Sequence, residues 1–186
     1  TEVGKLIQRE AAATLKRVTL ELGGKSPNIV FADADLEQAV RGALTGIFYN
    51  QGQVCTAGSR LLLERSVHDA FLAKLLDGAS KMQPGDPLSP KSRMGPLVSQ
   101  QQLERVLGYV AKGKAEGARL EVGGERVGDK GYFVPPTVFT GVTNDMTIAR
   151  EEIFGPVLSV IPFDDVADAT RIANDTIYGL AAAVWT

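Results

Sequence analysis

Apolar residues along the chain switch repeatedly between the spacing of a helix and that of a strand. Helical spacing predicts helices at residues 3–15, 36–49, 67–81, 100–116 and 164–174. Alternating or continuous β-prone runs predict strands at residues 17–22, 26–32, 60–64, 119–122, 132–140, 156–163 and 180–185. Because strands and helices alternate over most of the length, we predict an α/β fold with three layers, in which helices flank a mostly parallel sheet.

Three segments modify this plan. Pro135 and Pro136 interrupt the strand predicted at 132–140 and indicate an edge or a bend. Residues 83–99 are rich in proline and glycine, which predicts an irregular connection. The run at 180–185 is apolar and predicts a buried final strand.

Composition narrows the class of protein. The chain has 186 residues, of which 44% are hydrophobic and 23% charged, as in a soluble globular protein. A net charge of −2 and the lack of a basic run or a long apolar stretch argue against nucleic acid and membrane as partners. A single cysteine excludes an internal disulfide, so we expect a reducing, cytoplasmic compartment.

Both ends of the sequence interrupt a pattern. The chain starts without methionine inside a helical repeat, and it ends in the apolar run LAAAVWT. We therefore expect a piece of a longer protein.

The only cysteine, Cys55, lies in the sequence NQGQVCTAGSR at residues 50–60. A free cysteine is usually a small buried apolar residue, but glycines and polar residues surround this one. The segment also connects a predicted helix to a predicted strand, where functional sites are common. Small neighbours allow a substrate carbon to approach the sulfur, and they leave backbone N–H groups free to bind an oxyanion. We therefore predict that Cys55 is a nucleophile.

A thiol nucleophile needs a group that takes its proton. The only histidine, His68, starts a predicted helix beside Asp69 and is more typical of a solvated helix end. Glu21 is the alternative, because it ends the predicted strand 17–22 just before two glycines. Active sites of parallel sheets lie at the carboxyl ends of strands, and glycines permit close approach of a ligand or another segment.

The sequence EEIFGPV at residues 151–157 places two acids, an aromatic residue and a Gly-Pro turn before a strong strand. On its own it indicates only a strand boundary with a core phenylalanine. The chain has no GxGxxG or phosphate-loop pattern and no metal-ligand spacing, so we predict no metal site. Asp33 and Asp35 are typical of helix N-caps.

Taken together, these segments resemble the aldehyde dehydrogenase superfamily, in its hydrolytic, NAD(P)-dependent type. The resemblance runs over the whole chain and is carried by VTLELGGKSPNIVFADADL, FYNQGQVCTAGSR, GYFVPPTVF, EEIFGPV and YGLAAAVWT. It implies that Cys55 attacks an aldehyde to give a thiohemiacetal, which loses hydride and becomes a thioester. It also implies that Glu21 is the general base that activates water to hydrolyse the thioester. Relatives that pass the acyl group to CoA generally lack this glutamate.

The resemblance further implies cofactor contacts. Glu152 matches the residue that hydrogen-bonds the nicotinamide ribose, and Phe154 matches an aromatic residue near the nicotinamide. Leu22 and Gly23 border the nicotinamide pocket. Val3 lies in TEVG, residues 1–4, which matches the end of a cofactor-binding segment. The cofactor is then NAD or NADP.

The domain plan follows from the same resemblance. Residues 1–23 match the tail of the Rossmann-like cofactor domain, and residues 24–186 match the cysteine-bearing catalytic domain without its last part. We therefore expect this chain to be inactive or nearly so by itself. We also expect a homodimeric or homotetrameric full-length parent and a small aldehyde as substrate, with Val54 and Thr56 lining its site.

One alternative uses the same cysteine without a nicotinamide. A cysteine-dependent hydrolase or acyltransferase would turn over esters and would not reduce NAD.

Overall fold

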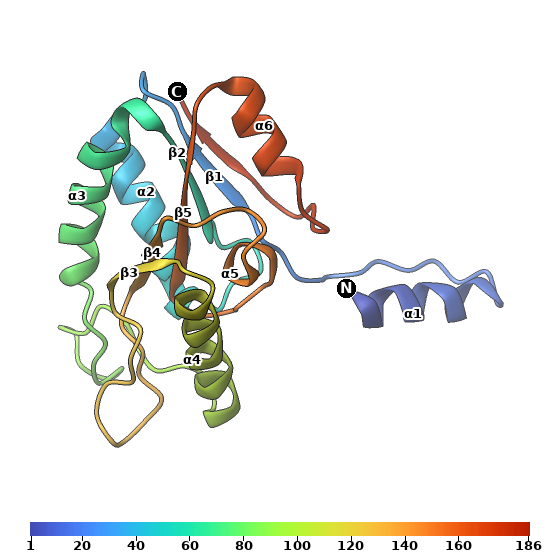
Figure 1. Cartoon of the computed structure of the whole chain (residues 1–186). Coiled ribbons are helices and arrows are strands. Elements are labelled where there is room, and N and C mark those ends of the chain that lie inside the picture. The colour runs from blue at the N-terminus through green and yellow to red at the C-terminus, as the bar shows by residue number, and fades with distance from the viewer.

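A computed structural model describes residues 1–186, and its centre is one six-stranded sheet (Figure 1). The order of the strands is β3-β4-β5-β2-β1-β6. All neighbouring strands are parallel except β3, which pairs antiparallel with β4. The strands are β1 (Pro27–Val30), β2 (Arg60–Glu64), β3 (Arg119–Val122), β4 (Thr137–Thr140), β5 (Val157–Phe163) and β6 (Ala183–Trp185). The predicted α/β class with a mostly parallel sheet is therefore confirmed.

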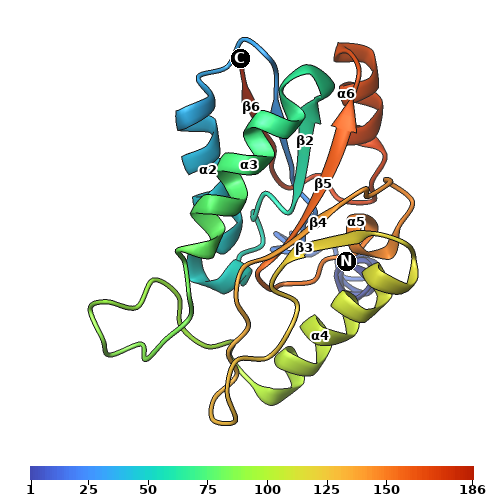
Figure 2. The same ribbon diagram turned by 60° about the vertical axis from the view of Figure 1, so that its left-hand side comes forward.

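Helices cover both faces of this sheet, which makes three layers (Figure 2). One face packs against α2 and α3, and the other packs against α4, α5 and α6. The helices are α1 (Glu2–Ala12), α2 (Leu36–Phe48), α3 (His68–Ser80), α4 (Gln100–Ala115), α5 (Thr147–Arg150) and α6 (Val166–Asn174). No helix has both the length and the apolar character that crossing a membrane requires.

Alternation along the strands divides the core into two clusters. Leu61 and Leu63 of β2 face the α2–α3 layer, whereas Leu62 between them joins the cluster on the other side. Successive side chains of a strand point to opposite faces, so a run of apolar residues supplies both layers at once. All three leucines are fully buried.

Polar side chains cap the start of three helices, α2, α4 and α6. The Asp35 carboxylate accepts a hydrogen bond of 3.1 Å from the Gln38 N–H at the start of α2, as the sequence predicts. Ser99 caps α4 and Asp165 caps α6 in the same way. Each cap satisfies an N–H group that the helix itself leaves unpaired.

Helix α1 does not pack on the sheet. Figure 1 shows α1 and the extended segment after it standing away from the body of the molecule. The exposed fractions of Val3 and Leu15 are 69% and 92%. The only residue of α1 that is buried is Gly4, which lies against Leu22 of the returning chain.

Two strand predictions are wrong. Residues 17–22 form an extended segment outside any strand, because no other strand lies beside them to complete a ladder. The final strand exists but is not buried: β6 is an edge strand, and Val184 is 57% exposed. The run predicted at 132–140 is shorter than expected, because β4 begins only after Pro136.

A buried arginine joins the sheet to α6. Arg60, the first residue of β2, is 0% exposed, and its side chain donates to the carbonyl oxygens of Lys25, Ile172 and Ala173 at 3.0, 2.9 and 2.9 Å. It also donates to Asn144 Oδ1 at 3.0 Å. The two α6 carbonyls lie at the C-terminus of that helix, where a positive charge is favourable. Burial lowers the pKa of Arg60, and the nearby Asp175 opposes this shift.

Arg60→Met should therefore destabilise the chain by about 3 kcal/mol or more, because it leaves buried carbonyl groups without a donor. Urea denaturation followed by circular dichroism measures the effect. Arg65→Met is the matched control, since Arg65 pairs with Asp164 on the surface and is 62% exposed. Equal unfolding midpoints for the two variants would contradict the structural role of Arg60.

Candidate active site

Cys55 lies on a tight turn just before β2. The Ala57 N–H donates to the Val54 carbonyl at 3.1 Å, so Cys55 and Thr56 occupy the two corners of this turn. The N–H groups of Cys55 and Thr56 donate no hydrogen bond within the chain. The Cys55 side chain is half-buried. A partly accessible sulfur beside unpaired N–H groups is an arrangement that can bind the oxyanion formed when a thiolate attacks a carbonyl.

A left-handed stretch leads into this turn. Asn50, Gln51 and Gly52 have φ values of 49°, 57° and 69°. This conformation is unfavourable for residues other than glycine. At Gly52 it is combined with close packing, because a Cβ there would lie 2.1 Å from the Gly155 carbonyl oxygen. The cysteine loop and the EEIFGP loop therefore touch through their backbones.

A third segment, Gly23–Gly24, packs between these loops. The Gly24 N–H donates to Glu152 Oε1 at 3.1 Å. A Cβ on Gly24 would lie 2.4 Å from the Cys55 carbonyl oxygen, and a Cβ on Gly23 would lie 2.2 Å from Glu152 Oε2. The two glycines thus bring the cysteine loop and the Glu152 carboxylate together, in agreement with the close approach inferred from the sequence.

Side chains of α4 fix the segment that carries Glu152 and Phe154. Gln102 Nε2 donates to the Phe154 carbonyl at 2.7 Å, and Arg105 Nη2 donates to the Glu152 carbonyl at 2.6 Å. The Tyr109 hydroxyl donates to Glu151 Oε2 at 2.6 Å. Burial and this hydrogen bond raise the pKa of Tyr109 to about 12. Sequence analysis missed these supporting residues, which show only the spacing of an ordinary amphipathic helix.

Phe154 is held in an uncommon backbone conformation. Its φ is 59°, and its side chain remains 38% exposed although large aromatic residues usually bury more of their surface. The ring therefore presents an accessible aromatic surface near Glu152 and Gly24, which line the same small hollow.

Three residues of the candidate site gather at one end of the sheet. Cys55, Glu152 and Gly24 precede β2, β5 and β1, so they gather at the amino ends of three parallel strands. The sequence-based prediction placed Glu21 at the carboxyl end of a strand, and this part is wrong because residues 17–22 form no strand of this sheet.

The remaining predicted residues lie outside this cluster. Glu21 is exposed and forms no hydrogen bond or ion pair. Leu22 packs on Gly4 of α1, and Val3 is exposed on α1. The structure therefore brings together Cys55, Gly23 and Glu152 but does not place Glu21 or Val3 beside them, so the roles of these two residues stay predictions.

His68 cannot assist Cys55 in this fold. Cys55 precedes β2, whereas His68 follows β2 and starts α3, so the length of the strand separates them. The His68 ring is paired with the Asp69 carboxylate at 2.8 Å. No group of three or more His, Cys, Asp or Glu side chains is placed to hold a metal ion.

A pocket of about 280 Å³ opens beside the nucleophile turn. Val54 and Thr56, which flank Cys55, both line it, together with Tyr49 and Trp185. The Trp185 indole N–H donates to Asn28 Oδ1 at 2.8 Å, which fixes one wall. Small residues, including Gly42 and Gly46 of α2, leave the pocket open.

Lys25 is a second residue that sequence analysis missed. Its side chain is 1% exposed, and its ammonium nitrogen has no hydrogen-bond partner. Burial, followed by repulsion from Arg60, lowers the pKa of Lys25 from 10.5 to about 7, while Glu152 and Glu151 partly oppose the shift. The feature of the sequence that could have pointed to Lys25 is its place directly before an apolar strand.

The chain belongs to the aldehyde dehydrogenase family, whose model matches residues 1–186. It is 54% identical to aldehyde dehydrogenase 1A1 of Gallus gallus over its full length, and it spans 37% of that relative. A Mus musculus relative named "Aldehyde dehydrogenase, cytosolic 1" is 53% identical.

Solved structures agree with this assignment. An NAD+ complex of aldehyde dehydrogenase from Bacillus cereus is 54% identical, with a TM-score of 0.95 over 99% of this chain and 38% of the enzyme. Gamma-glutamyl-gamma-aminobutyraldehyde dehydrogenase from Burkholderia cenocepacia is 59% identical, with a TM-score of 0.94 over 100% of this chain and 38% of the enzyme. The chain thus spans somewhat over a third of the length of these relatives.

Gly52→Ala should displace the nucleophile loop, because the new Cβ meets the Gly155 carbonyl and φ is positive. We expect a loss of stability of about 1–3 kcal/mol and a changed rate of Cys55 labelling by a maleimide. Gly108→Ala on α4 is the control, since no atom lies within 4 Å of its Cβ position. Unchanged labelling and stability in Gly52→Ala would contradict the packing described for this loop.

Lys25 should make stability depend on pH. Its pKa is about 7 in the folded chain and near 10.5 when exposed, so between these values the unfolded chain binds more protons. The free energy of unfolding should therefore rise as the pH increases from about 7 towards 10. Denaturant midpoints at pH 7 and pH 9, compared between wild type and Lys25→Met, measure this rise. The same increase in both proteins would show that Lys25 is not its source.

Proposed function

We propose that the protein containing this chain oxidises an aldehyde to a carboxylic acid, using NAD or NADP and a covalent intermediate on Cys55. The observation that carries the proposal is the half-buried Cys55 on a turn with unpaired N–H groups, in backbone contact with the segment that holds Glu152. Membership of the aldehyde dehydrogenase family supports it.

The first step is attack on the aldehyde. The Cys55 sulfur, as thiolate, forms a bond to the carbonyl carbon, and the carbonyl oxygen becomes an oxyanion. The unpaired N–H groups of Cys55 and Thr56 can donate to that oxygen. Formation of a tetrahedral carbon converts the aldehyde hydrogen into one that can leave as hydride.

Once the hydride has left, the carbon belongs to a thioester on Cys55. The last step is hydrolysis of this thioester, for which we propose Glu21 as general base. The Glu21 carboxylate takes a proton from water, the water oxygen bonds to the acyl carbon, and the sulfur leaves as thiolate. Glu21 lies two residues before Gly23, which touches Glu152, so a change in the extended segment 17–22 can bring the carboxylate towards the cysteine. Its presence favours the hydrolytic type over CoA acylation.

The residues around Glu152 fit a nicotinamide nucleotide. A ribose offers hydroxyl donors, and the Glu152 carboxylate is an acceptor that uses one oxygen on Gly24. The accessible Phe154 ring suits the flat nicotinamide, and the lack of a side chain at Gly23 permits close approach. The cofactor, when bound, accepts the hydride. The NAD+ complex of the Bacillus cereus relative supports NAD as the cofactor.

The aldehyde would occupy the pocket beside Val54 and Thr56. Tyr49 and Trp185 supply aromatic surface there, which favours a substrate with an apolar part. We further propose that residues 1–23 belong to the cofactor domain, that residues 24–186 belong to the catalytic domain, and that the whole protein is a cytoplasmic homodimer or homotetramer. The separate α1 arm and the exposed apolar residues on it support the division.

A chimera tests the roles of Cys55 and Glu21. Residues 1–186 replace the matching segment of the Bacillus cereus enzyme, and NADH formation is measured with short aldehydes. Cys55→Ser and Glu21→Gln should each lower the rate by about 100-fold or more, because each removes a reacting group. Glu10→Gln, which removes an exposed carboxylate from α1, should leave the rate near that of the chimera.

Three results would count against the proposal. Near-normal NADH formation in Cys55→Ser or in Glu21→Gln would remove the role assigned to that residue. Ester hydrolysis by a folded chimera that forms no NADH would favour the hydrolase alternative. The isolated chain should form little NADH with short aldehydes, and turnover similar to that of the chimera would contradict the domain division proposed above.

A further inference from the structure

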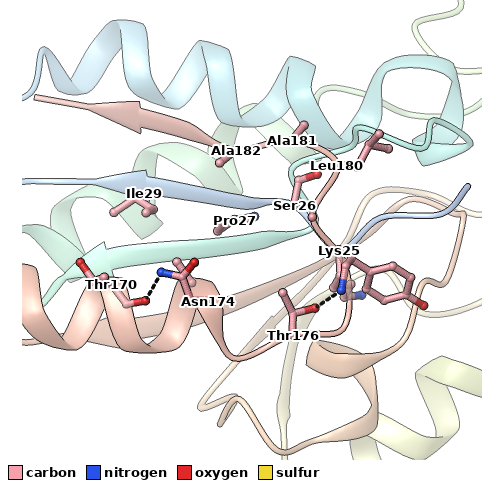
Figure 3. Close-up of a pocket in the computed structure, with 13 residues that line it drawn as sticks. Lys25, Ser26, Pro27, Ile29, Thr170, Asn174, Thr176, Leu180, Ala181 and Ala182 are labelled. Atoms are coloured by element: carbon pink, nitrogen blue, oxygen red, sulfur yellow. Dashed lines mark hydrogen bonds between the residues drawn. The ribbon is translucent and has the colours of Figure 1, made fainter. Parts of the chain in front are cut away.

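A second and larger pocket lies at the amino end of β1, on the α6 side of the sheet. Its volume is about 470 Å³. Figure 3 shows Lys25, Ser26 and Thr176 at one end of it, and Thr170 and Asn174 of α6 towards the other. It shares Ser26 and Pro27 with the pocket beside Cys55, so the two pockets adjoin.

Two residues that line this pocket each carry a buried polar atom without a partner. These atoms are the Lys25 ammonium nitrogen and the Ser26 hydroxyl oxygen, and no other buried side-chain nitrogen or oxygen in the chain lacks a hydrogen bond. The residues are 1% and 4% exposed, and both line the pocket. Leaving such donors unpaired costs free energy, so a group that accepts from them would bind favourably.

The charge of the residues that line the pocket favours a negatively charged ligand group. Lys25 is the only lysine or arginine in the lining, and no aspartate or glutamate is present there. The neighbouring polar groups are already engaged, since Asn174 Nδ2 donates to the Thr170 carbonyl at 2.8 Å and the Tyr178 N–H donates to Thr176 Oγ1 at 3.3 Å. Lys25 is thus left as the charged donor of the lining, and its nitrogen has no partner in the chain.

The remaining walls are apolar. Ile29, Ala173 and Leu180 line the pocket together with Ala181 and Ala182. The volume exceeds that of a single small inorganic anion, and ligand pockets of this size commonly combine apolar walls with a few polar groups. The ligand that matches both features has a negatively charged head and a short hydrocarbon part.

We propose that this pocket binds a small aliphatic carboxylate, which accepts a hydrogen bond from the Lys25 ammonium. The pairing is charge-assisted and takes place away from bulk water, which strengthens it. The other charged groups near Lys25 are Arg60, Glu151 and Glu152. This site does not depend on Cys55 or on the proposed oxidation.

The ionisation of Lys25 gives the site a pH dependence. The lysine is charged below its pKa of about 7 and neutral above it, so the carboxylate should bind more tightly at low pH. Binding in turn stabilises the ammonium and raises the pKa of Lys25. Tyr178 also lines the pocket and carries no charge-paired partner among the lining residues.

Isothermal titration calorimetry of the chain with sodium butyrate tests the proposal, with butyramide as the uncharged ligand of the same shape and phosphate as a bare oxyanion. Butyrate should bind at pH 6 and at least about tenfold more weakly at pH 9, since little Lys25 remains charged there. Lys25→Met should lower the affinity at least about tenfold, whereas Lys114→Met, which changes an exposed lysine of α4, should not.

A measurement without a variant covers the case in which Lys25→Met fails to fold. The chain is produced with ¹³C-labelled lysine, and the Lys25 Cε signal is titrated by NMR with and without butyrate. An upward shift of the Lys25 pKa with butyrate, but not with butyramide, supports the site. The proposal is overturned if butyramide binds as tightly as butyrate, if phosphate binds more tightly than butyrate, or if the Lys25 titration is the same with and without butyrate.

Discussion

The buried guanidinium of Arg60 is the interaction on which the amino end of the sheet depends. It connects the start of β2 with the carbonyl of Lys25 before β1 and with two carbonyls at the end of α6. These segments are far apart in the sequence and carry no other charged group that reaches all of them. A cation at this point aligns the loops that precede two neighbouring strands, and the nucleophile turn is part of one of them.

The site is assembled largely from backbone rather than from side chains. Gly24 and Gly52 allow three loops to pack at distances that exclude a Cβ atom. The side chains of Cys55 and Glu152 are thereby fixed through the main chain that carries them, and α4 holds the Glu152 segment from outside. Such an arrangement gives precise placement with few side-chain contacts, which leaves the surrounding pockets free for ligands.

Local signals were sufficient for most elements, and they also singled out Cys55 as a candidate. The cap at Asp35, the apolar run of β2 and the polar, glycine-rich surroundings of Cys55 are all properties of neighbouring residues. Residues 17–22 show the limit of such signals, because they have the composition of a strand and lack a partner to pair with. The sequence does not reveal the exposure of β6 for a similar reason. Whether a strand lies at the edge of a sheet depends on the topology and not on neighbouring residues.

The contacts that sequence analysis missed join distant segments. Arg60 and Lys25 are both cations at the start of apolar strands. Only the fold reveals that the Arg60 side chain donates to the Lys25 carbonyl, whereas the Lys25 ammonium has no partner. The order of the strands likewise decides which loops meet, so the gathering of Cys55 and Glu152 at amino ends could not be derived from spacing. The resemblance to a family implied that Cys55 and Glu152 belong to one site, but it did not give the geometry of that site.

The extended segment between α1 and β1 has a consequence for how this protein can vary. Glu21 sits on a tether that contributes almost nothing to the two cores, whereas Cys55 sits on a turn anchored in the sheet. Substitutions along the tether can therefore change where the carboxylate lies without a penalty in folding. Selection can adjust the position of this carboxylate and the architecture separately, because different parts of the chain encode them.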